Sequence, residues 1–149
     1  MAADYSEIEN ANLLVEAFGY WPRFHDAELF SFNLSRGSLL PEKDSWEFPS
    51  IEARLHVFEM TSDVTPDGYF ILHKHHLVDF RFEGVEDLHL EGFNHQNVLL
   101  GLEFRPIDGS PQRFEVFFDS AFGADAKFSC SRIVITGLAP CGPKGSACA

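Results

Sequence analysis

The sequence has few basic residues and no long apolar run. Its 11 Lys and Arg stand against 23 Asp and Glu, which gives a net charge of −12 at pH 7 with His neutral. Proteins that bind nucleic acid rely on clustered Lys and Arg, so we expect no nucleic-acid partner. No apolar run approaches the ~20 residues of a membrane-spanning helix, and we therefore expect no association with a membrane.

Cysteine is also scarce. There are three, Cys130, Cys141 and Cys148, and this odd number is a poor basis for a disulfide framework. A structural zinc site needs four ligands, which these thiols do not supply. The first fifteen residues contain no Lys or Arg, unlike the start of a secretory signal. These features predict a cytoplasmic protein, because the cytosol keeps thiols reduced.

Motifs of common catalytic sites are missing as well. The chain has no G-x-S-x-G sequence, no glycine-rich phosphate loop and no cysteine in an electropositive setting. We therefore predict a protein without catalytic activity, and we expect neither a cofactor nor a bound metal.

Apolar residues, in contrast, make up 45% of the chain, and 16 of its residues are Phe. A chain of 149 residues with this content can bury one sizeable core, which predicts a single domain over residues 1–138. The end of the chain, residues 139–149, has little to pack and is expected to be a disordered tail. Ser6 and Glu9 match a helix-capping box, so we expect a helix to begin at Ser6 and to end at Gly19.

After this helix the apolar residues follow a period of two, which is typical of strands with one buried face. The segments that alternate in this way, separated by turn residues, are 30–35, 51–57, 78–83, 88–90, 98–104, 114–118 and 127–135. They predict a mainly β (α+β) fold, an antiparallel sandwich or partly closed barrel of about seven strands with one N-terminal helix. Residues 37–49 are expected to form a loop whose Trp46 and Phe48 fold back onto the body.

Acidic residues are dense between residues 79 and 91, where Arg81 is the only base. A field of this sign attracts a basic partner and speeds its association, although a solvated surface without a partner is the alternative. The following polar turn, Asn94–Asn97, joins two apolar strands. Its side chains serve either turn formation alone or recognition, since a rigid sheet presents its loops. The residues predicted to bind a protein partner are Asp79, Glu83, Glu86, Asp87, Glu91, Asn94 and His95.

The histidines leave other functions open. His25 is followed by Asp26, and His73–His76 is the densest histidine group, with His56 as a further candidate ligand. Imidazole and carboxylate groups serve metal binding and general acid–base catalysis, so one alternative is a small metal-dependent enzyme that uses these residues. Another is an accessory protein that binds a small molecule in a Phe-lined interior.

An aromatic string precedes the first strand. Trp21, Pro22, Phe24, His25 and Asp26 lie within six positions, and Pro22 disfavours helix at the residue before it. The aromatic content predicts a packed structural motif at this turn.

The segment Phe18–Glu28, which contains this string, resembles the bacterial immunity protein 50 family. The resemblance continues at His56–Thr61, Phe82–Val85 and Glu91–Asn97, and it covers the chain from Phe18 to about Thr136. It implies an immunity protein of a bacterial polymorphic toxin system, which binds and neutralises a cognate toxin, such as a nuclease, inside the cell that makes it. It implies no catalytic residue.

Overall fold

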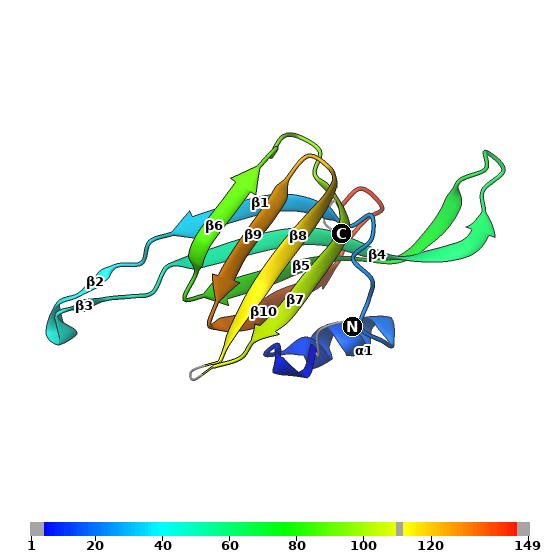
Figure 1. The fold of residues 1–149 in the computed structure, drawn as a ribbon. Coiled ribbons are helices and arrows are strands. Elements are labelled where there is room, and N and C mark those ends of the chain that lie inside the picture. The colour runs from blue at the N-terminus through cyan, green and yellow to red at the C-terminus, as the bar shows by residue number, and fades with distance from the viewer. Residues whose placement is uncertain (1–4, 110–111, 146–149) are drawn as a thin grey trace.

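Eight strands form one antiparallel sheet, and a separate two-stranded hairpin projects from it (Figure 1). The computed structural model describes residues 5–109 and 112–145. The strands of the sheet are β1 (Glu28–Ser35), β4 (Ser50–Val64), β5 (Phe70–Glu83), β6 (Glu86–Glu91), β7 (Val98–Ile107), β8 (Arg113–Phe122), β9 (Asp125–Cys130) and β10 (Arg132–Pro140). The hairpin consists of β2 (Leu39–Leu40) and β3 (Ser45–Trp46), joined by a 3-10 helix at Pro41–Lys43.

The sheet has the order β10-β5-β4-β1-β7-β8-β9-β6 and is not closed into a barrel. β1 joins its two halves, because it pairs with β4 over its length but with β7 only where Glu28 lies opposite Val98. The predicted mainly β, antiparallel fold with an N-terminal helix is therefore confirmed, with eight strands in the main sheet where about seven were expected.

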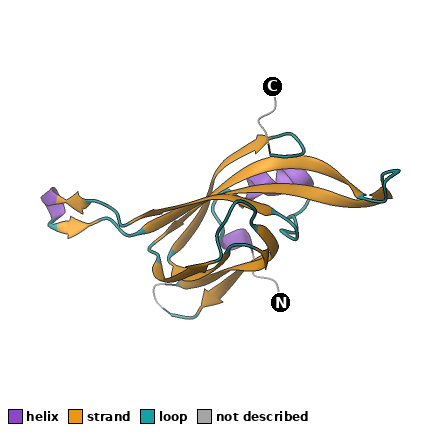
Figure 2. Cartoon of the chain, turned by 90° about the horizontal axis from the view of Figure 1, so that it is seen from above, coloured by secondary structure: helices purple, strands orange, loops and turns teal. Residues whose placement is uncertain are grey.

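The core lies between the two halves of the sheet, which face each other (Figures 1 and 2). Phe82 of β5 contacts Phe118 of β8 and Phe128 of β9, with ring centroids 6.0 and 5.0 Å apart. Phe80 of β5 lies 6.0 Å from Phe104 of β7. These contacts follow from the alternation in sequence, because each strand turns its apolar side chains to the same face.

A 3-10 helix at Tyr5–Glu7 lies where a helix was expected to begin, but it does not continue, and the α-helix α1 (Ala11–Phe18) begins five residues after the predicted start at Ser6. The reason is that the backbone of Glu9 is bound to β10: its N–H donates to Ile133 O (2.9 Å), and its carbonyl accepts from the N–H of Ile135 (2.9 Å). Glu9 is thus held as an extended residue before the helix begins. The predicted end at Gly19 is confirmed, since Gly19 has a φ of 86° and its N–H donates to Val15 O.

Two arms project from the body in opposite directions (Figures 1 and 2). One is the β2–β3 hairpin, where the expectation that Trp46 and Phe48 fold back is wrong, because their exposed fractions are 51% and 76%. The guanidinium of Arg36 covers the Trp46 ring instead, 4.6 Å from its centroid. The other arm is the outer part of β4 and β5, which extends past its neighbouring strands.

The first residues of the predicted disordered tail, residues 139–141, are ordered in the structure. Ala139 and Pro140 are the last residues of β10, and Cys141 is buried, with its N–H donating to His75 O (3.0 Å). The edge of β5 therefore orders these residues. The last part of the predicted tail, residues 146–149, lies outside the described residues. Within the described ranges, no helix is both long enough and apolar enough to cross a membrane.

Candidate functional site

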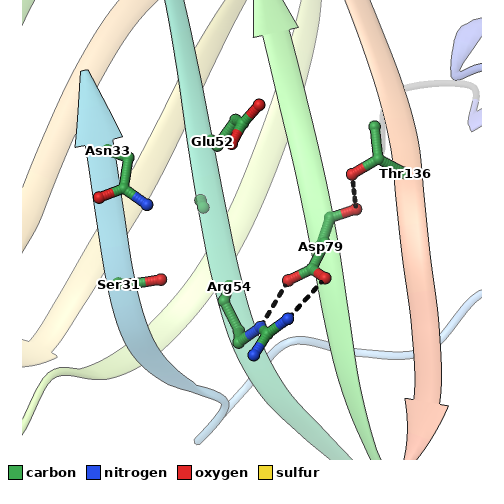
Figure 3. Close-up of a pocket in the computed structure, with 7 residues that line it drawn as sticks. Ser31, Asn33, Glu52, Arg54, Asp79 and Thr136 are labelled. Carbon is green, nitrogen blue, oxygen red and sulfur yellow. Dashed lines mark hydrogen bonds and ion pairs between the residues drawn. The ribbon is translucent and has the colours of Figure 1, made fainter. Parts of the chain in front are cut away.

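The acidic residues predicted to bind a partner fall into two groups in the structure. Asp79 and Glu83 lie on the outer face of β5, where neighbouring strands supply arginines. Arg54 reaches across from β4 and donates two hydrogen bonds to the Asp79 carboxylate, of 2.7 and 3.0 Å (Figure 3). This bidentate pair compensates the charge of Asp79.

Glu83 is compensated in the same way. It accepts hydrogen bonds from Arg81 (2.9 Å) and Arg132 (3.0 Å), and Arg132 also binds Glu9. The hydrogen bond from Arg81, with that from Arg132, lowers the pKa of Glu83 despite its partial burial. The outer face of β4, β5 and β10 therefore carries a network of ion pairs rather than an acidic field.

A polar hollow of about 330 Å³ lies on this face, and Figure 3 shows its residues on β1, β4, β5 and β10. Thr136 borders it on β10, with its hydroxyl donating to the backbone oxygen of Asp79 (3.4 Å). The hollow contains both hydrogen-bond donors and hydrogen-bond acceptors. Its polar lining residues are Ser31, Asn33, Glu52, Arg54, Asp79 and Thr136.

The second acidic group, Glu86, Asp87 and Glu91, lies on the edge strand β6, and all three residues are exposed. Among the described residues, Glu86 is the one member of this group in an ion pair, with its carboxylate 3.6 Å from the Arg113 guanidinium. A distance of this length gives weak compensation at an exposed site. β6 thus presents acidic side chains along a free edge of the sheet.

The strand register adds acidic residues that were not predicted. Asp125 on β9 lies opposite Glu91, and Asp119 on β8 is close enough to Asp125 and Glu103 for their charges to act on it. Partial burial first, and then these two carboxylates, raise the pKa of Asp119. In sequence, each of these residues lies at a polar position of a strand whose apolar and polar residues alternate, which predicts that its side chain points outward. Only the register shows that these side chains are neighbours.

Asn94 and His95 occupy the loop between β6 and β7. The Asn94 side chain accepts a hydrogen bond from the N–H of Gln96 (2.9 Å) and donates one to Gly92 O (2.9 Å). Asn94 therefore shapes the loop, whereas His95 is exposed.

The aromatic string packs at the turn before β1. Trp21 is half-buried and stacks on Tyr5, with ring centroids 5.1 Å apart, and Phe24 packs edge-on against Trp21 at 5.7 Å. Phe24 and Pro22 are buried, and the Phe24 ring contacts Phe80 in the core.

His25 and Asp26 turn away from this packing. The exposed imidazole of His25 lies 3.1 Å from Leu100 O, and 3.7 Å from the Asp26 carboxylate. The N–H of Asp26 donates to Leu99 O (2.8 Å), and its φ is 66°, so its backbone shapes the turn. Within the described part of the chain, no hydrogen bond or ion pair connects these residues with His73–His76.

One pair of histidines is brought together on β4 and β5. His56 Nε2 lies 2.9 Å from His75 Nδ1, and His56 is buried. His73 does not join this pair, and Lys74, between His73 and His75, has a φ of 57° that interrupts the alternation of the strand. Among the described residues, no group of three or more His, Cys, Asp or Glu is placed to hold a metal ion.

A hydrogen bond between the facing nitrogens of His56 and His75 needs one nitrogen to donate and the other to accept. It is lost if both rings are protonated, because both nitrogens then carry a hydrogen. Burial lowers the pKa of each imidazole, and the charge of His75 lowers that of His56 further. Their proximity therefore favours neutral rings in the folded state.

We expect the free energy of unfolding to decrease as the pH falls from about 7.5 to about 5.5. The unfolded histidines titrate near 6.5, and the folded pair below that, so the unfolded chain binds more protons in this range. Thermal melts at both pH values measure the effect. The double variant His56→Gln/His75→Gln should lose much of this dependence, and the exposed pair His89→Gln/His95→Gln should keep it. Equal dependence in the two variants would contradict the assignment.

Residues 10–141 match the family model of Immunity protein 50. No curated protein and no solved structure matches the chain. The matched range contains α1 and every strand described above, including the aromatic string and both acidic groups. The chain therefore belongs to the Immunity protein 50 family.

Proposed function

We propose that the chain binds a cognate protein toxin in the bacterial cytoplasm and neutralises it by covering its functional surface, without catalysing a reaction. The family match over residues 10–141 is the observation that carries this proposal. The buried free thiol of Cys130 is compatible with a reducing compartment.

The acidic surface of β6 is the part of the molecule that best suits a basic toxin. Glu86, Asp87 and Glu91 are exposed and weakly compensated, whereas Asp79 and Glu83 are bound by arginines. Asp119 and Asp125 extend the negative charge along the neighbouring strands. A nuclease is one class of toxin with a basic cleft, since it must hold a phosphate backbone.

A growth-rescue experiment tests the proposed function. The toxin domain encoded beside the gene is induced in cells with and without this chain, and an unrelated acidic protein serves as the control. We expect this chain to restore growth and the unrelated acidic protein not to restore it. A toxic neighbour that the folded chain fails to neutralise would overturn the proposal.

Charge reversal tests the acidic surface separately. The triple variant Glu86→Lys/Asp87→Lys/Glu91→Lys should slow association with the purified toxin by about tenfold or more, and should weaken its dependence on salt. The control Glu7→Lys/Glu16→Lys/Glu42→Lys changes the net charge equally at exposed positions elsewhere. Association rates measured by stopped flow should fall less in the control. If both variants associate equally fast, β6 is not the surface that attracts the toxin.

A further inference from the structure

We propose that the groove between the segment 20–25 and the outer part of β4 docks an extended segment of the toxin, one that carries an apolar side chain next to a carboxylate. This inference rests on the proposed function, and it concerns a different surface from the acidic edge of β6. The groove has a volume of about 310 Å³. Its principal lining residues are Tyr20, Arg23, His25, Phe58, Met60 and Phe70.

The edge of β4 that borders the groove is unpaired among the residues that the structure describes. β1 and β4 pair as far as Glu28 opposite His56, while β4 continues to Val64. Beyond His56, in the described part of the chain, no strand pairs with β4 on the side of β1. An extended segment can add to an open edge of this kind through backbone hydrogen bonds.

The groove is held in shape by polar contacts at its inner end. The hydroxyl of Tyr20 donates to the Glu59 carboxylate, which joins the segment 20–25 to β4. Lys74 Nζ on β5 donates to Glu59 (3.3 Å) and to Phe18 O (2.8 Å). These contacts fix the two walls relative to each other, so little ordering is needed when a partner binds.

The walls of the groove are apolar and accessible. The exposed fractions of Tyr20, Met60 and Phe70 are 43%, 43% and 54%. Tyr20 comes from the segment before β1, whereas Met60 and Phe70 lie on the two strands of the β4–β5 hairpin. Clustered exposed apolar groups of this kind are typical of binding surfaces, and aromatic residues with arginine are frequent where binding energy concentrates. An apolar side chain of the partner therefore fits between them.

Charge selects a carboxylate beside that apolar side chain. Glu59 is already bound by Tyr20 and Lys74, whereas Arg23 forms no hydrogen bond or ion pair with any described residue. The uncompensated charge of the groove is therefore positive, in a chain whose net charge is −12. An arginine fork binds a carboxylate through two parallel hydrogen bonds.

Binding of the purified toxin domain to the intact chain, measured by calorimetry, tests the groove. We expect Arg23→Glu to weaken binding by about tenfold or more, and the double variant Met60→Ser/Phe70→Ser to do the same. The matched controls, Lys43→Glu and Leu39→Ser/Phe48→Ser, change similar residue types at exposed positions in or beside the β2–β3 arm and should stay within about twofold. Unchanged melting temperatures establish that the variants are folded.

The outcomes separate this inference from the proposed function. If the unaltered chain does not bind the toxin, the proposed function and the inference both fail. If it binds, and the groove variants bind equally tightly, only the groove is overturned. If Arg23→Glu increases the affinity, the proposal that the toxin segment carries a carboxylate is overturned, because the gain indicates a basic segment in the groove.

Hydrogen exchange provides a readout that does not depend on substitutions. On binding the toxin, those backbone amides of residues 58–64 that point away from β5 should exchange several-fold more slowly, because the free edge becomes paired. The amides of the β2–β3 hairpin should be unaffected. Unchanged exchange at 58–64 in the saturated complex would overturn strand addition at this edge.

Discussion

Phe82→Ala is expected to lower the free energy of unfolding by about 3–5 kcal/mol, the range for removing a large buried aromatic side chain. Phe82 is fully buried on β5, and its ring contacts rings from both halves of the sheet. The contacting rings are Phe80, Phe104, Phe118 and Phe128, with centroids 5.0 to 6.4 Å away. Truncation therefore leaves a cavity where the two halves meet, which these large side chains can fill only in part.

Urea denaturation measures this loss, with Phe122→Ala as the matched control. Phe122 lies at the end of β8 with 54% of its surface exposed, so its truncation should cost less than about 1 kcal/mol. If the two variants were destabilised equally, the contact between the halves of the sheet would not be the main source of stability at Phe82.

Asn97→Ala is expected to cost about 2–4 kcal/mol, because it leaves buried backbone groups without partners. The Oδ1 atom of Asn97 accepts from the N–H groups of Asn94 and Ala124, both at 3.0 Å. Its Nδ2 donates to Asn94 O (2.8 Å) and Leu29 O (3.3 Å). One side chain thus connects the β6–β7 loop with β1 and with the β8–β9 turn.

The exposed Asn33 on β1 provides the control for this substitution, since Asn33→Ala should change stability by less than about 0.5 kcal/mol. Amide exchange at Ala124 gives a local readout, because its N–H loses its acceptor in Asn97→Ala. A stability loss without faster exchange at Ala124 would contradict the proposed role of the side chain.

The β1 strand shows why a correct strand prediction can still place side chains wrongly. Its alternation predicted Phe30, Phe32 and Leu34 on one buried face. The structure has a bulge between Leu29 and Ser31, so Leu29 is buried and Phe30 is 37% exposed. A bulge adds a residue to one strand and shifts the parity of the residues after it, and a single strand's pattern does not reveal where it occurs.

The acidic segment shows the corresponding limit for the candidate site. Its density in sequence predicted one acidic surface over residues 79–91. Asp79 and Glu83, however, are paired with Arg54 and Arg132 from neighbouring strands. Asp119 and Asp125, which lie outside this segment, add negative charge near β6 instead. Compensation between strands depends on register, which is a property of the assembled sheet.

The sequence by itself determined the mainly β fold class, the position of most strands and the C-terminal end of the helix. Alternating apolar residues specify strands with one buried face, Gly19 ends the helix, and the aromatic string at residues 21–24 packs because its side chains must leave water. Only the tertiary structure decided which charges are compensated, that His56 meets His75, and that a groove forms beside β4. The reason is physical: burial follows from local pattern, whereas pairing across strands depends on register and on how the sheet folds over.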